Sequence, residues 1–186
     1  MDNFKSCCFT GYRPHKFNFE FSENSKEYVK LENKLVDAIF SLPEQNCFTF
    51  YCGMAMGFDI LAGEIVALLK NTYKNAKVEL VAVIPFEKQS DSFDDEWKKR
   101  YNKLLKKCDR IVYVSRAYHK GCFAARNKYM VDNSDFVITW FDGQSGGTAA
   151  TLAYAQKNGK RIINLAENGV HSYECEDLFE IIFDEE

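Results

Sequence analysis

Six short runs of apolar residues recur along the chain and predict β-strands. Within each run the hydrophobic residues are nearly continuous instead of alternating with polar ones, which is typical of strands covered on both faces. The predicted strands are Cys7–Thr10, Phe48–Cys52, Val78–Ile84, Arg110–Ser115, Phe136–Phe141 and Arg161–Leu165. Burial on both faces predicts a sheet in the interior of an α/β protein.

The segments between these runs have the spacing of amphipathic helices. In the first of them, apolar side chains repeat at helical intervals from Tyr28 to Ile39, and Asn24 followed by Glu27 resembles a capping box. In the third, acidic residues precede a series of lysines and arginines, an order that the helix dipole favours. The last ends before Gly159. The predicted helices span residues 26–42, 58–72, 92–107, 122–133 and 147–158.

The alternation of strands and helices predicts a Rossmann-like, doubly wound α/β fold, with a mainly parallel sheet and helices on both faces. No repeat or low-complexity linker divides the chain, so we expect one domain over residues 1–186, with a core at about 5–166 and an acidic tail at about 170–186. Ligands of such sheets bind outside the carboxyl ends of the strands, where the strand order reverses. The loops that follow the strands are therefore where a site is expected.

The loop after the first strand reads Thr10-Gly11-Tyr12-Arg13-Pro14-His15-Lys16. Gly11 permits a tight turn, and the guanidinium of Arg13 offers a planar fork to a phosphate or a carboxylate. The alternative interpretation is a plain turn with solvated basic side chains.

Two further loops are rich in glycine and lead directly into predicted helices. Backbone N–H groups at such a turn can bind an anion at the helix N-terminus. The loop after the second strand matches neither the dinucleotide fingerprint nor the P-loop. The candidate binding residues are Gly53, Met56, Gly57 and Asp59 after the second strand, and Asp142, Ser145, Gly146, Gly147 and Thr148 after the fifth. We expect the four glycines to line one pocket, on the premise that the two loops leave neighbouring strands.

Several side chains near these loops have two interpretations. Asp59 either caps its helix or holds ribose hydroxyls. After the third strand, Phe86 can stack on a base and Gln89 can read the edge of that base. Arg126 and Asn127 either join the site or face solvent, whereas Trp97 and Tyr101 are better explained as core residues on a helix stripe.

Composition and charge narrow the function classes. A hydrophobic content of 46% can fill a core and excludes a disordered chain. Residues 174–186 hold seven acidic side chains and no basic one, so the first 173 residues carry a formal charge of +4, which suits a small anion better than a long nucleic-acid track. We expect a soluble cytoplasmic protein, because no apolar run is long enough to span a membrane and no secretory signal is present.

The sequence offers no recognisable catalytic or metal-binding set. Seven cysteines in no zinc-like spacing are interpreted as reduced, mostly buried thiols. His15, His119 and His171 are scattered and form no pair. We expect no metal and no cofactor other than a nucleotide-derived ligand.

At these loops the sequence resembles the YpsA-like branch of the SLOG superfamily, a Rossmann-like group that also contains the LOG and DprA/Smf proteins. The likeness spans roughly residues 5–166 and rests on F-T-G-Y-R-P-H-K, G-M-A-M-G-F-D-I-L-A-G-E, P-F-x-x-Q with a following W-K-K-R-Y, Y-V-S followed by G-C-F-A-A-R-N-K-Y-M-V-D, and D-G-Q-S-G-G-T. It implies a bacterial or phage protein with a nucleotide-type ligand. Because YpsA-like members are linked to cell division, it also implies a protein partner in that process.

The resemblance leaves three function classes open. The first is a sensor or regulatory module that binds a ligand of the ADP-ribose or NAD type. The second is an N-glycosidic hydrolase or transferase related to LOG, with Glu64 or Asp59 as the reacting carboxylate; against it, the paired glutamates that follow the LOG glycine motif are replaced by Ala149-Ala150-Thr151. The third is DprA-like binding of nucleic acid along the Lys98–Lys107 face, which we do not favour. The sequence leaves the oligomeric state open, including a homo-oligomer.

Overall fold

The computed structural model describes residues 5–73 and 77–166, and in them six strands form one wholly parallel sheet. The strand order is β4-β3-β2-β1-β5-β6. The strands are β1 (Lys5–Thr10), β2 (Cys47–Cys52), β3 (Glu79–Phe86), β4 (Arg110–Ser115), β5 (Phe136–Thr139) and β6 (Arg161–Asn164). All six lie where the apolar runs predict them, and the Rossmann-like α/β fold is confirmed.

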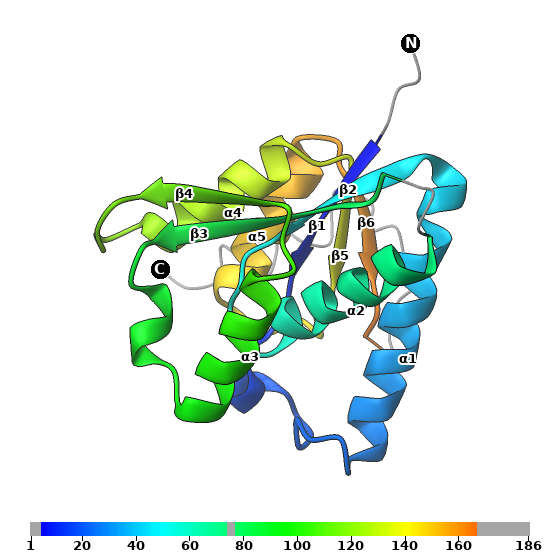
Figure 1. The fold of residues 1–186 in the computed structure, drawn as a ribbon, viewed down its shortest axis with the longest axis horizontal. Coiled ribbons are helices and arrows are strands. Elements are labelled where there is room, and N and C mark those ends of the chain that lie inside the picture. The colour runs from blue at the N-terminus through cyan, green and yellow to red at the C-terminus, as the bar shows by residue number, and fades with distance from the viewer. Residues whose placement is uncertain (1–4, 74–76, 167–186) are drawn as a thin grey trace.

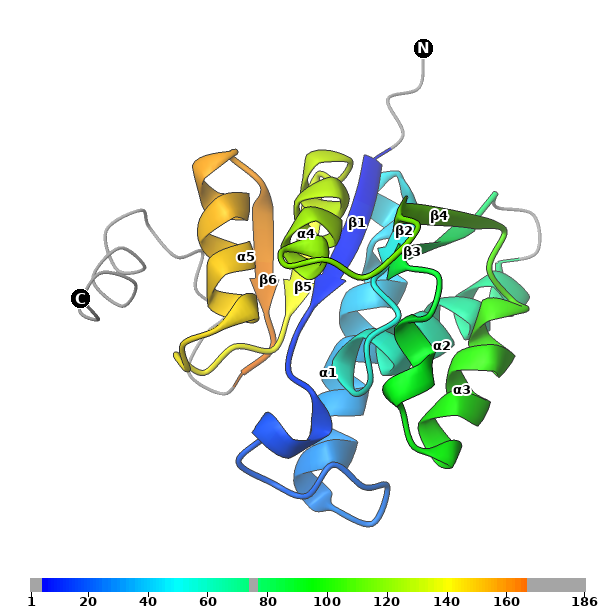
Figure 2. The same ribbon diagram turned by 90° about the vertical axis from the view of Figure 1, so that its left-hand side faces the viewer.

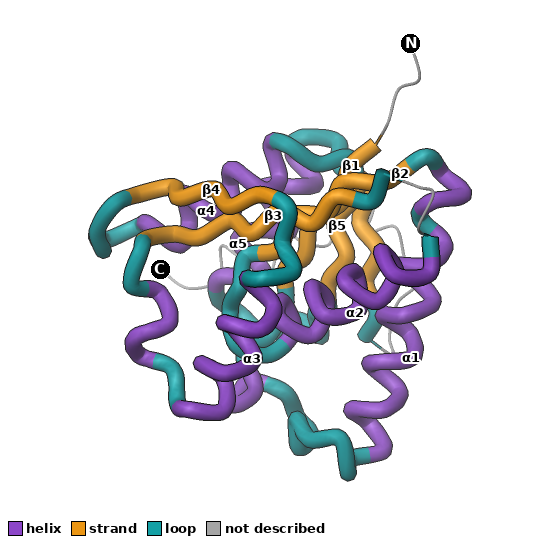
Figure 3. The backbone as a smooth tube through the Cα atoms, viewed as in Figure 1, coloured by secondary structure: helices purple, strands orange, loops and turns teal. Residues whose placement is uncertain are grey.

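Helices cover both faces of this sheet (Figure 3). They are α1 (Lys26–Ser41), α2 (Phe58–Thr72), α3 (Asp95–Leu105), α4 (Cys122–Asp132) and α5 (Gly147–Lys157), with short 3-10 turns η1 (Pro14–Lys16), η2 (Pro43–Gln45) and η3 (Gln89–Ser92). In Figure 1, α1, α2 and α3 lie in front of the sheet, and α4 and α5 lie behind it. This is the doubly wound arrangement that the alternation of strands and helices predicts.

The strand order reverses beside β1. The chain proceeds outward from β1 through β2 and β3 to β4, and then crosses to β5 on the other side of β1. Thr10, the last residue of β1, pairs with Thr139, the last residue of β5. The carboxyl ends of these two strands therefore form the switch point. Figure 2 shows the loops that follow them leaving the same edge of the sheet.

This order corrects one premise of the sequence analysis. The two glycine-rich loops do not leave neighbouring strands, because β1 lies between β2 and β5. The order of strands depends on contacts between residues far apart in the chain, which no local pattern reports.

The central strands are buried because helices pack on both of their faces. The side chains of Cys7, Cys8 and Phe9 in β1 are fully buried. Six of the seven cysteines lie in the described residues and are unpaired, and Cys175 lies outside them. Burial raises the pKa of the Cys8 thiol to about 12, which leaves it an unreactive core residue.

At three elements a local contact accounts for a difference from the prediction. Helix α1 is capped by Ser25, whose hydroxyl accepts a hydrogen bond from Tyr28 N–H, and not by Asn24. Helix α3 begins three residues later than expected, because Asp94 caps it and residues 89–92 form a separate 3-10 turn. Strand β5 stops at Thr139, since the backbone of Phe141 then bonds to the Asn164 side chain.

The edge strand β4 also differs from the prediction of burial on both faces. Its side chains Ile111 and Tyr113 are 42% and 49% exposed. A strand at the edge of a sheet has one neighbour only, so part of its surface stays open to solvent.

Candidate ligand-binding site

A cavity of about 180 Å³ lies at the switch point of the sheet. Seven of the predicted site residues line it: Gly11, Arg13, Asp59, Arg126, Asn127, Gly147 and Thr148. Five others that the sequence analysis did not select also line it: Thr10, Tyr12, Lys16, Ala55 and Phe123. Three of these, Thr10, Tyr12 and Lys16, belong to the first loop motif; Ala55 and Phe123 carried no signal of their own.

The loops after β1 and β2 pack so closely that two glycines are required. A Cβ at Gly11 would overlap the ring of Phe58, the first residue of α2. Gly57 has a φ of +90°, and a Cβ there would lie 2.7 Å from the carbonyl oxygen of Tyr12. The N–H of Phe58 donates to that same oxygen over 3.2 Å. The absence of a side chain at Gly57 thus lets the two loops approach closely enough for this bond.

A buried ion pair lies on one wall of the cavity. Asp59 and Arg126 are each 5% exposed, and Arg126 Nη1 lies 3.5 Å from Asp59 Oδ2. Burial raises the pKa of Asp59 to about 6 and lowers that of Arg126 from its usual range. Arg126 also donates to the carbonyl of Gly53, where a Cβ would overlap the guanidinium. Gly53 therefore shapes the site through its lack of a side chain.

Two cationic side chains and a helix N-terminus converge on the cavity. The Arg13 guanidinium lies over the Phe123 ring, 5.8 Å from its centroid. Lys16 Nζ would lie 3.1 Å from a Cβ at Gly146, the residue at the N-cap of α5. No side chain caps α5, and Gly147 and Thr148 in its first turn line the cavity, so the first amides of this helix have no side-chain acceptor. These features together form an anion-binding environment.

Tyr12 ties the loop after β1 to the loop after β5. Its hydroxyl donates to Asp142 Oδ1 over 2.6 Å and accepts from the N–H groups of Asp142 and Gln144 over 3.4 and 3.3 Å. Gln144 Nε2 in turn donates to the carbonyl of Lys16 over 3.3 Å. Burial and the Asp142 carboxylate raise the pKa of Tyr12, which keeps the hydroxyl protonated. Asp142 thus orders the loop that leads into α5.

We expect Tyr12→Phe to weaken anion binding by about tenfold and to lower the free energy of unfolding by roughly 1–2 kcal/mol, since a buried hydrogen-bonded hydroxyl is lost. The matched control is Tyr113→Phe on β4, where the ring is exposed. Calorimetric titration and urea denaturation measure both effects. Equal affinities in the two variants would show that Tyr12 does not organise the loop.

Other predicted site residues have different roles. Glu64 on α2 forms an ion pair with Arg100 on α3, 2.6 Å between Oε2 and Nη2, and is not among the residues that line the cavity. Gln89 is buried, its amide nitrogen donates to the carbonyls of Gly53 and Met54, and it is not among the residues that line the cavity. The Phe86 ring packs edge-on against Phe123. The four glycines were expected to line one pocket, but of them only Gly147 is among the residues lining this cavity.

Tyr101 and Trp97 on α3 pack against the core, as the sequence predicts. Tyr101 is 4% exposed, and Trp97 packs beneath the Arg100 guanidinium at 4.4 Å from the ring centroid.

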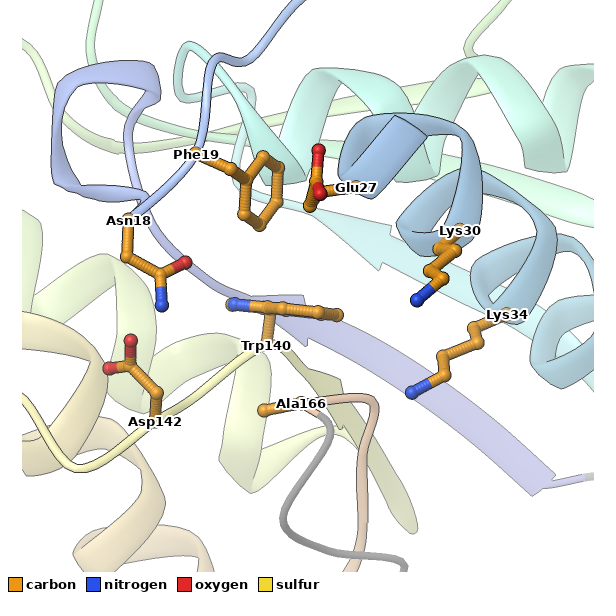
Figure 4. A pocket seen from close by; sticks show the side chains of 8 residues that line it. All are labelled: Asn18, Phe19, Glu27, Lys30, Lys34, Trp140, Asp142 and Ala166. Carbon is orange, nitrogen blue, oxygen red and sulfur yellow. The ribbon is translucent and has the colours of Figure 1, made fainter. Parts of the chain in front are cut away.

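A second cavity, of about 370 Å³, lies beside α1 (Figure 4). In Figure 4, Lys30 and Lys34 of α1 lie on one side of Trp140 and Asp142 lies on the other, and Glu27 on α1 lies next to Phe19. Lys34 Nζ donates to the carbonyl of Leu165 over 3.0 Å. Two lysines and two carboxylates in the lining leave no net charge, so this cavity lacks the cationic character of the first.

Within residues 5–73 and 77–166, no group of three or more His, Cys, Asp or Glu side chains is placed to hold a metal ion. His119 bonds to Ser115 Oγ and to the carbonyl of Lys120, and His171 lies outside the described residues. No helix in this part of the chain is long and apolar enough to cross a bilayer.

The loops that build the cavity are the ones that carry the resemblance to SLOG proteins. A family model for YpsA, described as "YspA SLOG family", matches residues 7–171. The chain belongs to the YpsA family of SLOG proteins. The match covers all the described strands and helices except the first two residues of β1.

Relatives of this YpsA-family chain occur in Listeria and Bacillus. The UPF0398 protein of Listeria monocytogenes serotype 4a (strain HCC23) is 27% identical over 180 residues, which cover 94% of this chain and 92% of the relative. The SPbeta prophage-derived protein YoqJ of Bacillus subtilis (strain 168) is 28% identical over 142 residues, which cover 69% of this chain and 82% of YoqJ.

Two solved structures share the fold of this YpsA-family chain. DNA processing protein A (DprA) of Streptococcus pneumoniae superimposes with a TM-score of 0.57 at 20% identity, over 87% of this chain and 50% of DprA. The DprA of Helicobacter pylori gives the same score and identity over 86% of this chain and 64% of its own. This chain thus spans half of the first structure and less than two thirds of the second.

Proposed function

We propose that this protein binds a nucleotide-derived anion of the ADP-ribose or NAD type at the switch-point cavity and acts as a sensor or regulatory module. The observation that carries the proposal is the convergence of Arg13 and Lys16 on the uncapped N-terminus of α5. A phosphate placed there receives backbone N–H bonds, the field of the helix dipole and a guanidinium fork. Family membership adds to this support, because SLOG proteins are associated with nucleotide ligands.

The proposed role of Asp59 combines its two sequence interpretations. Its carboxylate lies in the first turn of α2 and pairs with Arg126, yet it also lines the cavity. In the proposal it accepts a hydrogen bond from a ribose hydroxyl, and Gly147 and Thr148 contact the phosphate.

The carboxylates are placed less well for N-glycosidic hydrolysis. Such a reaction needs a carboxylate that is free to attack the ribose carbon or to accept a proton beside it. Asp59 supplies the one carboxylate in the described lining of the cavity, and it is held by Arg126. Glu64 is held by Arg100 outside the cavity. These contacts favour binding over turnover.

Single-stranded DNA is the second candidate ligand. The Helicobacter pylori DprA is described as having a unique single-stranded DNA binding mode. This chain shares its fold and carries exposed lysines on α3, but these lie on a helix that packs against α2 and contributes no residue to the cavity. The proposal therefore favours a small anion over single-stranded DNA as the ligand.

We expect Arg13→Glu to weaken ADP-ribose binding by about 50-fold or more, because a carboxylate replaces the phosphate-binding fork. The control is Lys99→Glu, which makes the same charge reversal at an exposed position on α3. Calorimetry with ADP-ribose, NAD and a single-stranded oligonucleotide measures the affinities. If the wild type does not bind ADP-ribose, and if Lys99→Glu no longer binds the oligonucleotide, single-stranded DNA replaces the nucleotide-derived anion as the proposed ligand.

Mass spectrometry of small molecules released from the purified protein would identify the ligand class directly. Incubation with nucleotides, NAD and ADP-ribose, followed by chromatography of free base, tests the hydrolase alternative. Turnover that disappears in Asp59→Asn or in Glu64→Gln would contradict the binding role.

A further inference from the structure

An apolar groove of about 530 Å³ adjoins the cavity. It runs between α4 and α5, which pack side by side, and it shares Phe123, Asn127 and Gly147 with the cavity lining. The exposed alanines Ala124 on α4 and Ala150 on α5 form its walls. Cavity and groove are therefore two parts of one continuous surface depression.

The volumes of the cavity and the groove indicate which part of a ligand each can hold. Sites for small organic ligands usually enclose about 300–1,000 Å³. The cavity, at about 180 Å³, is below that range and suits the phosphate groups alone. The groove, at about 530 Å³, supplies the room that the rest of a nucleotide requires.

Several polar side chains along the groove are engaged by neighbouring groups. Asn127 Nδ2 donates to Thr151 Oγ1 over 2.8 Å, and that hydroxyl donates to the carbonyl of Gly147 over 2.6 Å. Tyr154 donates to Asp132 Oδ1 over 2.7 Å, and the Lys128 ammonium lies 5.3 Å from the Tyr154 ring centroid. A surface whose polar groups are engaged in this way suits a flat, uncharged, largely apolar group.

The passage between the two parts is open. A Cβ at Gly147 would have no atom of the described chain within 4 Å, and Gly147 itself is exposed. Phe123 stands at the junction, with its ring next to the Arg13 guanidinium and within the groove lining. A ligand can therefore extend from the α5 N-terminus over Gly147 and place an aromatic ring against Phe123.

We propose that the α4–α5 groove holds the nucleobase of the same ligand whose phosphate groups bind in the cavity. This inference rests on the proposed function and extends it, because it assigns the uncharged end of the ligand to a defined surface. It follows from the continuity of the lining, the small size of the cavity and the hydrogen bonds that already engage Asn127, Thr151 and Tyr154 in the groove.

The test compares two ligands and two variants. Ala150→Leu and Ala124→Leu fill the groove from opposite helices, and both keep a good helix former at an exposed position. We expect ADP-ribose to bind at least tenfold more weakly in each variant, and inorganic pyrophosphate to bind within twofold of the wild type. The control Lys157→Leu adds the same side chain at the far end of α5, about 15 Å from Gly147 along the helix, and should change neither affinity.

Each outcome separates this inference from the proposed function. Unchanged ADP-ribose affinity in both variants, with pyrophosphate still bound, would overturn the groove assignment and leave the phosphate site intact. Failure of the wild type to bind either ligand would overturn the proposed function itself. A dimer that dissociates in Ala150→Leu in sedimentation experiments would assign the groove to a second copy of the chain instead.

Discussion

Gly147→Asp is expected to weaken ADP-ribose binding by about 100-fold or more. Gly147 is the first residue of α5, and it lines both the cavity and the groove. A carboxylate there would occupy the position proposed for a phosphate. At about 4 Å and an effective dielectric constant of about 20, two like charges repel by roughly 4 kcal/mol, and about 2.7 kcal/mol corresponds to a 100-fold loss.

The fold should tolerate this substitution. A Cβ at Gly147 meets no described atom within 4 Å, and the backbone there has no positive φ that would strain a side chain. An acidic residue in the first turn of a helix is also favoured by the helix dipole. We therefore expect the melting temperature of Gly147→Asp to stay at or above that of the wild type.

Gly147→Asn is the matched control, because asparagine has nearly the same shape as aspartate without the charge. It should weaken binding by only a few-fold in the same calorimetric titration. If the aspartate and asparagine variants lose affinity equally, the effect is steric and the phosphate does not bind at the α5 N-terminus.

Arg126→Met is expected to lower the free energy of unfolding by about 3–5 kcal/mol at pH 7.5, because it leaves the Asp59 carboxylate buried without its partner. Asp59 and Arg126 are each 5% exposed, so solvent cannot take over the lost interaction. Arg126 also donates to the Gly53 carbonyl, and that bond is lost as well.

The loss of unfolding free energy in Arg126→Met should become smaller as the pH falls. In the wild type, burial already raises the pKa of Asp59 to about 6, although Arg126 opposes the rise. An unfolded aspartate titrates near 3.9, so the Asp59 contribution is most favourable below that value and is lost as the pH increases through the folded pKa. Removing Arg126 raises the folded pKa further. The deficit of Arg126→Met should therefore shrink markedly between pH 7.5 and pH 5.

Urea denaturation at the two pH values measures this effect. The double variant Asp59→Asn, Arg126→Met has no buried charge at the pair, and we expect it to recover much of the stability at pH 7.5 with little pH dependence. A single Arg126→Met variant within 1 kcal/mol of the wild type at pH 7.5 would show that the pair is not buried as the structure has it.

Local patterns in the chain were sufficient to predict the helices and strands and to identify the loops that form the site. Continuous apolar runs predict strands because both faces of a parallel sheet are covered, and the observed strands β1 to β6 lie at those runs. Charged and glycine residues at the ends of strands, or in the helices that follow, lie where a doubly wound sheet binds its ligands. Five residues selected in this way line the cavity: Gly11, Arg13, Asp59, Arg126 and Gly147. The strands, the helices and the loops of the site could be predicted because they depend on residues that are neighbours in sequence.

Contacts between distant segments required the tertiary structure. The position of β5 beside β1, the pairing of Glu64 with Arg100, and the contacts of Gln89 with two carbonyls each join residues at least 30 positions apart. The same holds for Tyr12, which reads as an ordinary loop aromatic until its hydroxyl is seen to bond Asp142, 130 residues away. A sequence pattern reports which side chains are available, whereas the partner of each buried polar group is decided by how the strands are ordered and packed.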